Sequence, residues 1–124
     1  MGDKKIQMFY GEKQGGETME MIFKDETFET EVMGSDIPVF VDFYADWCGP
    51  CKMMIPVVEE LAKELEGRVK VGKLNVDENP NTASKFRVMS IPTFILIKDG
   101  EMKMNVMGAM SKQELLEKIE SALL

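Results

Sequence analysis

The stretch of sequence that most constrains the fold is a nearly continuous apolar run at residues Val39–Tyr44, with the sequence VFVDFY. Its β-branched and aromatic residues favour a strand. Only one residue of the run, Asp42, is charged. A strand that is apolar on both faces is typical of the middle of a sheet covered by helices on both sides. We therefore expect an α/β fold built around this strand.

The rest of the chain alternates between the hydrophobic periods of strands and helices. We expect further strands over residues 19–23, 69–76, 93–98 and 101–107. We expect helices over residues 26–33, 49–66, 80–86 and from 112 onward. The resulting order, β-α-β-α-β-α-β-β-α, predicts a central mixed β-sheet flanked by helices on both faces.

Several residues at the ends of these segments support the boundaries. Asp25 and Ser111 are expected to cap the helices that follow them, the second as part of a capping box. Asn79-Pro80 combines a cap with a proline at the first helical position. Asp99-Gly100 predicts a tight hairpin turn. Pro56 lies inside the helix expected over 49–66 and should kink it.

The 124 residues are enough for one domain, and 44% hydrophobic residues are enough for its core. Residues 1–18 differ in composition, so we expect an N-terminal extension there, disordered or an added leader, with residues 6–10 able to form an edge strand. Residues 19–124 should form the domain. The first residues contain no apolar segment like that of a secretory signal. We therefore expect a cytoplasmic, reducing environment.

The charge composition excludes several classes of function. The chain has 15 basic and 22 acidic residues, a net charge of -7, and only two arginines, Arg68 and Arg87. This balance argues against binding to nucleic acid or to an anionic membrane. The sequence contains no histidine, which excludes His-based acid–base catalysis and His-containing metal sites. No apolar run is long enough to cross a bilayer.

The two cysteines, Cys48 and Cys51, are three positions apart where the central strand gives way to a helix. The unpaired N–H groups and the partial positive charge of a helix N-terminus stabilise a thiolate. Cys48 is therefore the expected nucleophile, and Cys51, one helical turn later, is placed to resolve a mixed disulfide.

Three other interpretations of this pair remain open. A structural disulfide closing so short a loop would contribute only about 2 kcal/mol in the chain-entropy model. A zinc site needs four ligands, which only a dimer sharing two such pairs could supply here. The two residues could also be ordinary buried cysteines. The redox interpretation fits their spacing and position best.

The segment Val41–Lys52, VDFYADWCGPCK, resembles the active-site segment of thioredoxins. Other segments match that family in the same order along the chain: VGKLNVD at 71–77, SIPT at 90–93, DG at 99–100 and GA at 108–109. The resemblance covers about residues 19–124 and implies a thioredoxin fold. Tyr44 stands where many members have tryptophan, and Met89-Ser90 is a further departure; both bear on the choice of partners.

The resemblance implies a role for individual residues. Cys48 would attack the target disulfide and Cys51 would resolve it, with Gly49 and Pro50 between them. Asp42 would accept the proton of Cys51, and Lys73 would modulate Asp42. The alternatives are a solvated aspartate and an ordinary surface lysine.

The resemblance also implies a docking surface for protein substrates. Pro92 would be cis, against the alternative of a trans proline starting a strand, and the backbone of Ile91 would pair with the substrate chain. The apolar surface around the cysteines would consist of Trp47, Met89, Ile91, Met107 and Gly108. Met53 could enlarge it.

The implied activity is that of a protein-disulfide reductase in cell redox homeostasis, acting as a monomer on disulfide-containing proteins. No cofactor or metal would be bound. A thioredoxin reductase, carrying FAD and using NADPH, would restore the dithiol, and a ferredoxin-linked reductase is the alternative. An oxidase or isomerase usually has histidine between the cysteines, whereas Gly49-Pro50 favours a reductant. A non-catalytic binding module with the same fold is the alternative from another class.

Overall fold

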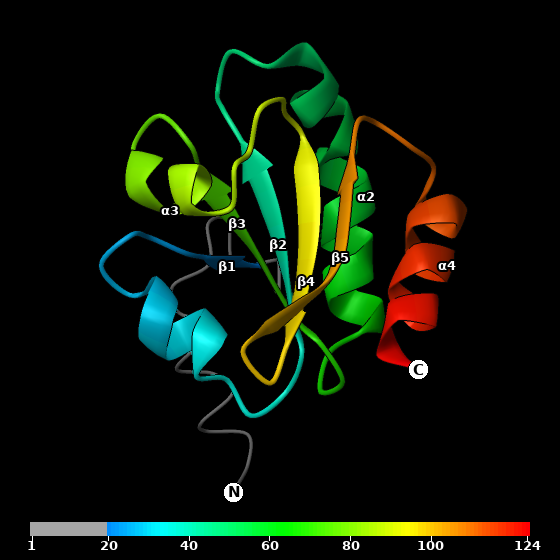
Figure 1. The fold of residues 1–124 in the computed structure, drawn as a ribbon. Helices are drawn as coiled ribbons and strands as arrows, with labels where there is room; N and C mark the ends of the chain where they lie inside the picture. The colour runs from blue at the N-terminus through cyan, green and yellow to red at the C-terminus, as the bar shows by residue number, and fades with distance from the viewer. Residues whose placement is uncertain (1–19) are drawn as a thin grey trace, which may run out of the picture.

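The computed structural model describes residues 20–124 and shows a mixed five-stranded sheet between two layers of helices (Figure 1). The expected extension at 1–18, with its edge strand over 6–10, lies outside the described residues, as does residue 19 of the first predicted strand. Within the described range, no helix is long and apolar enough to span a membrane.

The elements follow the predicted order. The strands are β1 (Met21–Ile22), β2 (Val39–Tyr44), β3 (Lys70–Asn75), β4 (Thr93–Lys98) and β5 (Glu101–Met107). The helices are η2 (Glu29–Met33), α2 (Gly49–Glu64), α3 (Pro80–Lys85) and α4 (Lys112–Leu123). Across the sheet the order is β1-β3-β2-β4-β5, with β1, β3 and β2 parallel and with β4 antiparallel to both β2 and β5. The predicted fold class is therefore confirmed.

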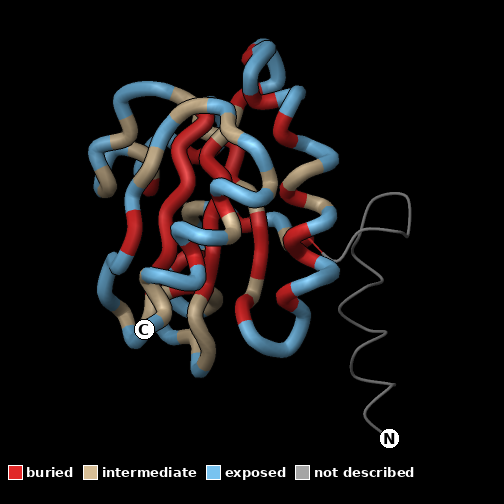
Figure 2. The backbone as a smooth tube through the Cα atoms, turned by 90° about the vertical axis from the view of Figure 1, so that its right-hand side faces the viewer, coloured by how far each residue is buried: buried red, intermediate tan, exposed pale blue. Residues whose placement is uncertain are grey.

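Side chains of β2 alternate between the two hydrophobic layers, as predicted for a strand buried on both faces. Phe40 packs with α2 and α4 on one face. Val39, Val41 and Phe43 pack with η2 and the end of α3 on the other. Figure 2 shows the buried strands in the interior, with exposed segments around them. Asp42 follows Phe40 by two positions and so lies on the α2 face.

The helix expected over 26–33 is shorter and different in kind. It is a π-helix over Glu29–Met33, in which the N–H of Gly34 donates to the carbonyl of Glu29 at 2.9 Å. Val32 of this helix and Phe28 directly before it are both buried, as their spacing predicted. The helix has no side-chain cap.

Asp25 caps a different helix from the one expected. Its carboxylate accepts hydrogen bonds from the backbone N–H groups of Asn81 and Thr82, at 3.2 and 2.9 Å, and from the Thr82 hydroxyl at 2.6 Å. It therefore caps α3 from another part of the chain. Asn79, predicted to cap α3, makes no such bond: its amide oxygen accepts from the Asp25 N–H at 2.9 Å, and its amide nitrogen donates to the Asn75 carbonyl at 3.1 Å.

Three other local predictions are confirmed. The Ser111 side chain accepts from the Glu114 N–H at 3.1 Å and caps α4. Asp99 and Gly100 have φ of 54° and 76°, the positive values that a two-residue hairpin turn requires. Pro56 lies inside α2; the kink expected there stays a prediction. The expected ends of α2 and β3 differ from the observed ends by one or two residues.

Candidate functional site

Cys48 and Cys51 form a disulfide at the junction of β2 and α2. Cys48 is the N-cap of α2, and its Sγ accepts a hydrogen bond from the Cys51 N–H at 3.2 Å. Both residues are nearly buried, at 3% and 5% exposure. Pro50 lies in the first turn of the helix, where its missing N–H costs no hydrogen bond. The pair is therefore positioned at the helix N-terminus that was expected to stabilise a thiolate.

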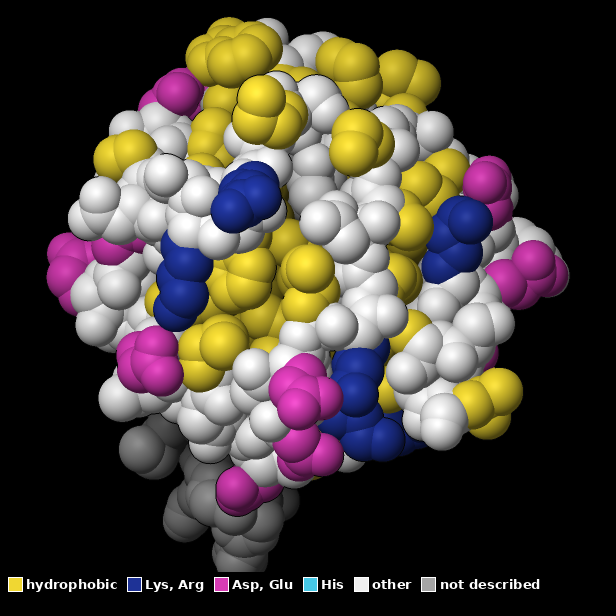
Figure 3. All heavy atoms as spheres, viewed as in Figure 1, with side chains coloured by type: hydrophobic (Ala, Val, Ile, Leu, Met, Phe, Trp, Pro, Cys, Tyr) yellow, Lys and Arg dark blue, Asp and Glu magenta, His cyan; other side chains and the backbone are white. Residues whose placement is uncertain are grey.

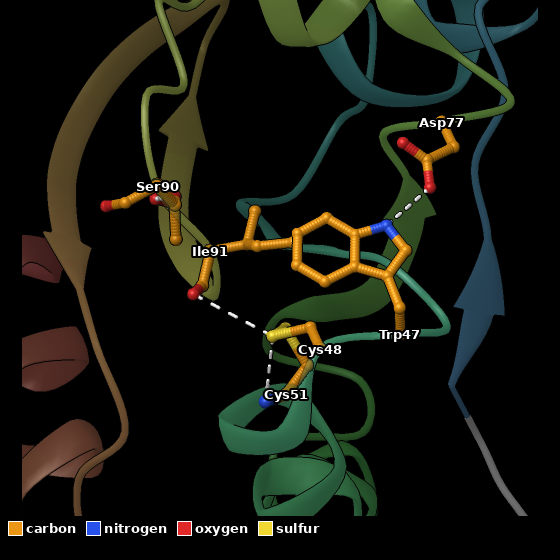
Figure 4. Close-up of a disulfide and its surroundings, with 7 residues drawn as sticks. Trp47, Cys48, Cys51, Asp77, Ser90 and Ile91 are labelled. Carbon is orange, nitrogen blue, oxygen red and sulfur yellow. Dashed lines mark hydrogen bonds between the residues drawn. A yellow bond between two sulfur atoms is a disulfide. The ribbon is translucent and has the colours of Figure 1, made fainter.

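The loop before β4 faces the disulfide. The Ile91–Pro92 peptide bond is cis, as the family resemblance implied. The carbonyl oxygen of Ile91 lies 3.8 Å from Cys48 Sγ, and Figure 4 shows it pointing at the sulfur. Two hydrogen bonds hold the loop: the Thr93 hydroxyl donates to the Ser90 carbonyl at 2.5 Å, and the Gly108 N–H donates to the Pro92 carbonyl at 2.9 Å. These contacts fix the backbone of Ile91 beside the disulfide.

Large apolar side chains are exposed at the same end of the molecule. We call this group the apolar rim; it consists of Trp47, Met53, Met89 and Met107, which are 70%, 69%, 89% and 60% exposed. Figure 3 shows hydrophobic side chains gathered at the end where β2 stops and α2 starts. Trp47 is fixed by its ring N–H, which donates to the Asp77 carboxylate at 2.8 Å (Figure 4).

Met107, another residue of the apolar rim, is positioned by the pairing of β4 and β5. Met107 pairs with Thr93, and the Ser90 hydroxyl lies 3.2 Å from the Met107 sulfur. Gly108, with φ of 98°, begins the turn out of β5. The structure thus places Ile91, Met107 and Gly108 in and beside the loop that faces the disulfide.

Asp42 is buried below Cys51. It is 6% exposed, and its Oδ1 has no hydrogen-bond partner among the described residues. It lines a cavity of about 170 Å³ that Cys51 and Lys73 also line. Burial, above all, raises the pKa of Asp42 to about 8; the charge of Glu20 raises it further, and that of Lys73 lowers it. The alternative of a solvated aspartate is therefore wrong.

Lys73 pairs with Asp42 in the register of β2 and β3, so the two side chains lie on the same face of the sheet. Its Nζ lies 5.3 Å from the centre of the Tyr44 ring. Lys73 is half-buried and lines the cavity, which argues against the alternative of an ordinary surface lysine.

Glu20 is a buried acidic residue of the cavity that sequence reasoning missed. It is only 7% exposed and lines the same cavity. Burial raises the pKa of Glu20 to about 7; the charge of Lys73 lowers it, and that of Glu59 raises it. The available signal was its position within the predicted strand over 19–23, where a charged residue among apolar neighbours is as unusual as Asp42 is in β2.

Across residues 20–124, no group of three or more Cys, Asp or Glu side chains is arranged to hold a metal ion. The cysteine sulfurs are bonded to each other, which is the oxidised form of the redox pair expected from the sequence. The arrangement can therefore store two electrons as two thiols, with a buried carboxyl in the cavity that Cys51 lines and an apolar surface at the same end of the molecule.

Comparison with known proteins identifies relatives over most of the chain. The family model described as Thioredoxin matches residues 19–121. A thioredoxin of Rickettsia conorii is 52% identical over 99 residues, covering 80% of this chain and 94% of its own length. Thioredoxin 1 of a Nostoc species is 50% identical over 99 residues, covering 80% and 92%. A chloroplastic M-type thioredoxin of Pisum sativum is 50% identical over 99 residues, covering 80% and 58%.

Proposed function

Since this chain belongs to the thioredoxin family and acts as a protein-disulfide reductase through its Cys48–Cys51 pair, we propose the role of each residue around that pair. Cys48 is the attacking nucleophile and Cys51 is the resolving thiol. The observation that carries this division is the different surroundings of the two sulfurs. Cys48 Sγ faces the Ile91 carbonyl, whereas Cys51 lines the cavity that holds Asp42.

The reaction proceeds by two thiol–disulfide exchanges. The Cys48 thiolate attacks one sulfur of the target disulfide and forms a bond to it. The S–S bond of the target breaks, and the other target sulfur leaves as a thiolate. Cys51 then gives its proton to the Asp42 carboxylate and attacks Cys48 Sγ. The second target thiolate leaves, and the Cys48–Cys51 disulfide remains. Two electrons have passed from the pair to the target.

Asp42 suits the role of proton acceptor because its raised pKa makes it a stronger base than an exposed aspartate. Lys73 moderates that basicity, since its positive charge favours the ionised carboxylate. Gly49 and Pro50 complete the first turn of α2. Pro50 fixes the backbone without removing a hydrogen bond from the helix.

The target chain docks along the loop before β4. The backbone of Ile91 pairs with the target in extended conformation, beside the cis Pro92, and Gly108 leaves room for it because nothing lies within 4 Å of its missing Cβ position. The apolar rim, with Trp47, Met89 and Met107, covers the residues flanking the target cysteine. Methionine is suited to varied partners because its side chain is flexible and polarisable.

The pair needs an external electron donor to work repeatedly. A thioredoxin reductase, which would carry FAD and take electrons from NADPH, reduces the disulfide, and this domain binds no cofactor of its own. The protein acts as a monomer in the cytoplasm on disulfide-containing proteins, without nucleic acid or membrane as partners. Its net charge of -7 supports the absence of nucleic acid and membrane partners, and the presence of only two cysteines supports a reducing environment.

Single cysteine variants test the division of roles. The reduced Cys51→Ser protein, incubated with insulin, should accumulate a covalent mixed disulfide, because the resolving thiol is missing. The matched Cys48→Ser protein should accumulate none at neutral pH. Non-reducing electrophoresis with mass analysis of the adduct distinguishes the two. Equal trapping by both variants would refute the assignment of Cys48 as the nucleophile.

The reduction potential of the pair tests the direction of the reaction. Equilibration against a dithiothreitol series should give a value near that of reducing thioredoxins, about -270 mV. A value well above the glutathione pool would indicate an oxidant or isomerase instead.

A further inference from the structure

Glu20 reaches the cavity below Cys51 from the edge of the sheet. Ile22 in β1 pairs with Lys73 in β3, which in turn pairs with Asp42 in β2. Side chains two positions apart in an extended segment share a face. Glu20 therefore lies on the same face as Ile22, Lys73 and Asp42, where α2 covers the sheet.

The cavity holds two acidic groups and one basic group from three neighbouring segments. Glu20, Asp42 and Lys73 line it together with Cys51, and Ile55 of α2 covers it. Both carboxyls are more than nine-tenths buried. Two carboxylates close together in a poorly hydrated site repel each other, so that one retains its proton.

We propose that Glu20 is a positioning residue for proton transfer at Cys51, sharing one proton with Asp42 across this cavity. The carboxyl pair, rather than Asp42 alone, then receives the proton of the resolving thiol. This inference rests on the proposed role of Asp42 as the proton acceptor.

The direction of both pKa shifts agrees with this geometry. The pKa of Glu20 is raised to about 7 and that of Asp42 to about 8. The negative charge of Glu20 is the second cause, after burial, of the raised pKa of Asp42. Between pH 7 and pH 8 the two carboxyls hold about one proton between them, with values that belong to the pair.

Other charged groups surround the pair of carboxyls. Lys73 of β3 lowers the pKa of both carboxyls, and Glu59 of α2 raises that of Glu20. The cavity lining also includes Tyr44 of β2, Asp46 of the loop after it and Lys52 of α2. Of these, Asp46 and Lys52 are exposed.

The proton balance follows from this arrangement. At neutral pH the pair with one proton carries one negative charge, opposite the positive charge of Lys73. When Cys51 loses its proton, the pair takes it and becomes neutral. The Cys51 thiolate then forms its bond to Cys48. The pair releases the extra proton to water before the next cycle.

Two measurements on Glu20→Gln test the proposal. The first follows the carboxyl signal of Asp42 by carbon NMR of the oxidised protein, labelled at aspartate and assigned by its loss in Asp42→Asn. The second uses 5,5′-dithiobis(2-nitrobenzoic acid): the reduced protein releases one nitrothiobenzoate when Cys48 attacks and another when Cys51 resolves. The rate of the second release is recorded against pH.

We expect Glu20→Gln to lower the midpoint of both pH profiles by about one pH unit, because a like charge next to Asp42 is removed. Glu101→Gln is the matched control, because it makes the same charge change at the hairpin on the opposite end of β4 and β5; it should leave both midpoints unchanged. Glu20→Met removes the charge without adding a buried amide, and should give the same shift.

The outcomes separate the two proposals. If both Glu20 variants leave the midpoints unchanged while Asp42→Asn abolishes the pH dependence of resolution, Glu20 is not coupled to the reaction and Asp42 keeps its role. If Asp42→Asn leaves that pH dependence intact, Asp42 is not the proton acceptor, and the inference about Glu20 is overturned with it.

Discussion

Replacing Asp42 by asparagine should stabilise the oxidised protein by an amount that grows with pH. In the unfolded chain this carboxyl ionises with its ordinary pKa of 3.8, whereas in the folded protein burial raises that value to about 8. The folded state therefore binds the proton more tightly, so the free energy of unfolding falls as pH rises between these two values. Below pH 3.8 the carboxyl is protonated in both states, and this contribution disappears.

The size of the effect follows from the two pKa values. Each pH unit between them corresponds to about 1.4 kcal/mol. The ionisation of Asp42 thus costs the folded state about 4 kcal/mol at pH 7 and nearly 6 kcal/mol above pH 8. Both energies are upper limits for burial alone, because the charge of Glu20 causes part of the raised pKa of Asp42. Asparagine adds a buried amide whose cost does not change with pH.

Urea unfolding of the oxidised wild-type and Asp42→Asn proteins, followed by circular dichroism from pH 4 to pH 9, measures the difference. The gap between the two unfolding free energies should widen by several kcal/mol over that range. The cost of the new amide shifts the whole gap but not its slope. Parallel pH profiles would refute the claim that burial raises the pKa of Asp42 in the folded protein.

Three further substitutions have defined consequences. Asp25→Ala removes the cap of α3, including the bond to the Thr82 hydroxyl, and should lower the free energy of unfolding by about 1–2 kcal/mol in urea titration; an unchanged midpoint would mean that the cap adds nothing. Gly72→Ala places a Cβ against the Phe23 ring and 2.9 Å from a backbone oxygen, and should cost about 1–3 kcal/mol, seen as a lower melting temperature; a neutral result would mean that the ring moves freely. Trp47→Ala removes an exposed side chain of the docking surface and should raise the KM for insulin while the unfolding midpoint stays nearly constant; a change in stability without a change in KM would give it a structural role only.

Local sequence patterns predicted the strands, caps and turns that depend on residues close together in the chain. The apolar run of β2 identified the central strand, and Asp42 within it pointed to a buried carboxyl. The capping box at Ser111 and the turn at Asp99-Gly100 formed as expected because their hydrogen bonds and dihedral angles are local.

Tertiary contacts decided the features that the sequence did not reveal. Asp25 has the chemistry of a cap, but it caps α3 and not the helix that follows it directly, because the loop after β1 and the start of α3 meet only in the folded protein. Glu20 was missed for the same reason. Its burial depends on the pairing of a two-residue strand with β3, which no periodicity in so short a segment can show.

The hydrogen bonds that join the loop after β1 to the start of α3 have a consequence for how the molecule opens. Asp25 and Asn79 each satisfy a group in the other's segment: the Asn79 amide accepts from the Asp25 N–H, while the Asp25 carboxylate holds the first turn of α3. Neither segment can open alone without breaking its hydrogen bonds to the other. The loop after β1 and the start of α3 therefore form one cooperative unit, whose amide hydrogens exchange with solvent through a single shared opening rather than two independent ones.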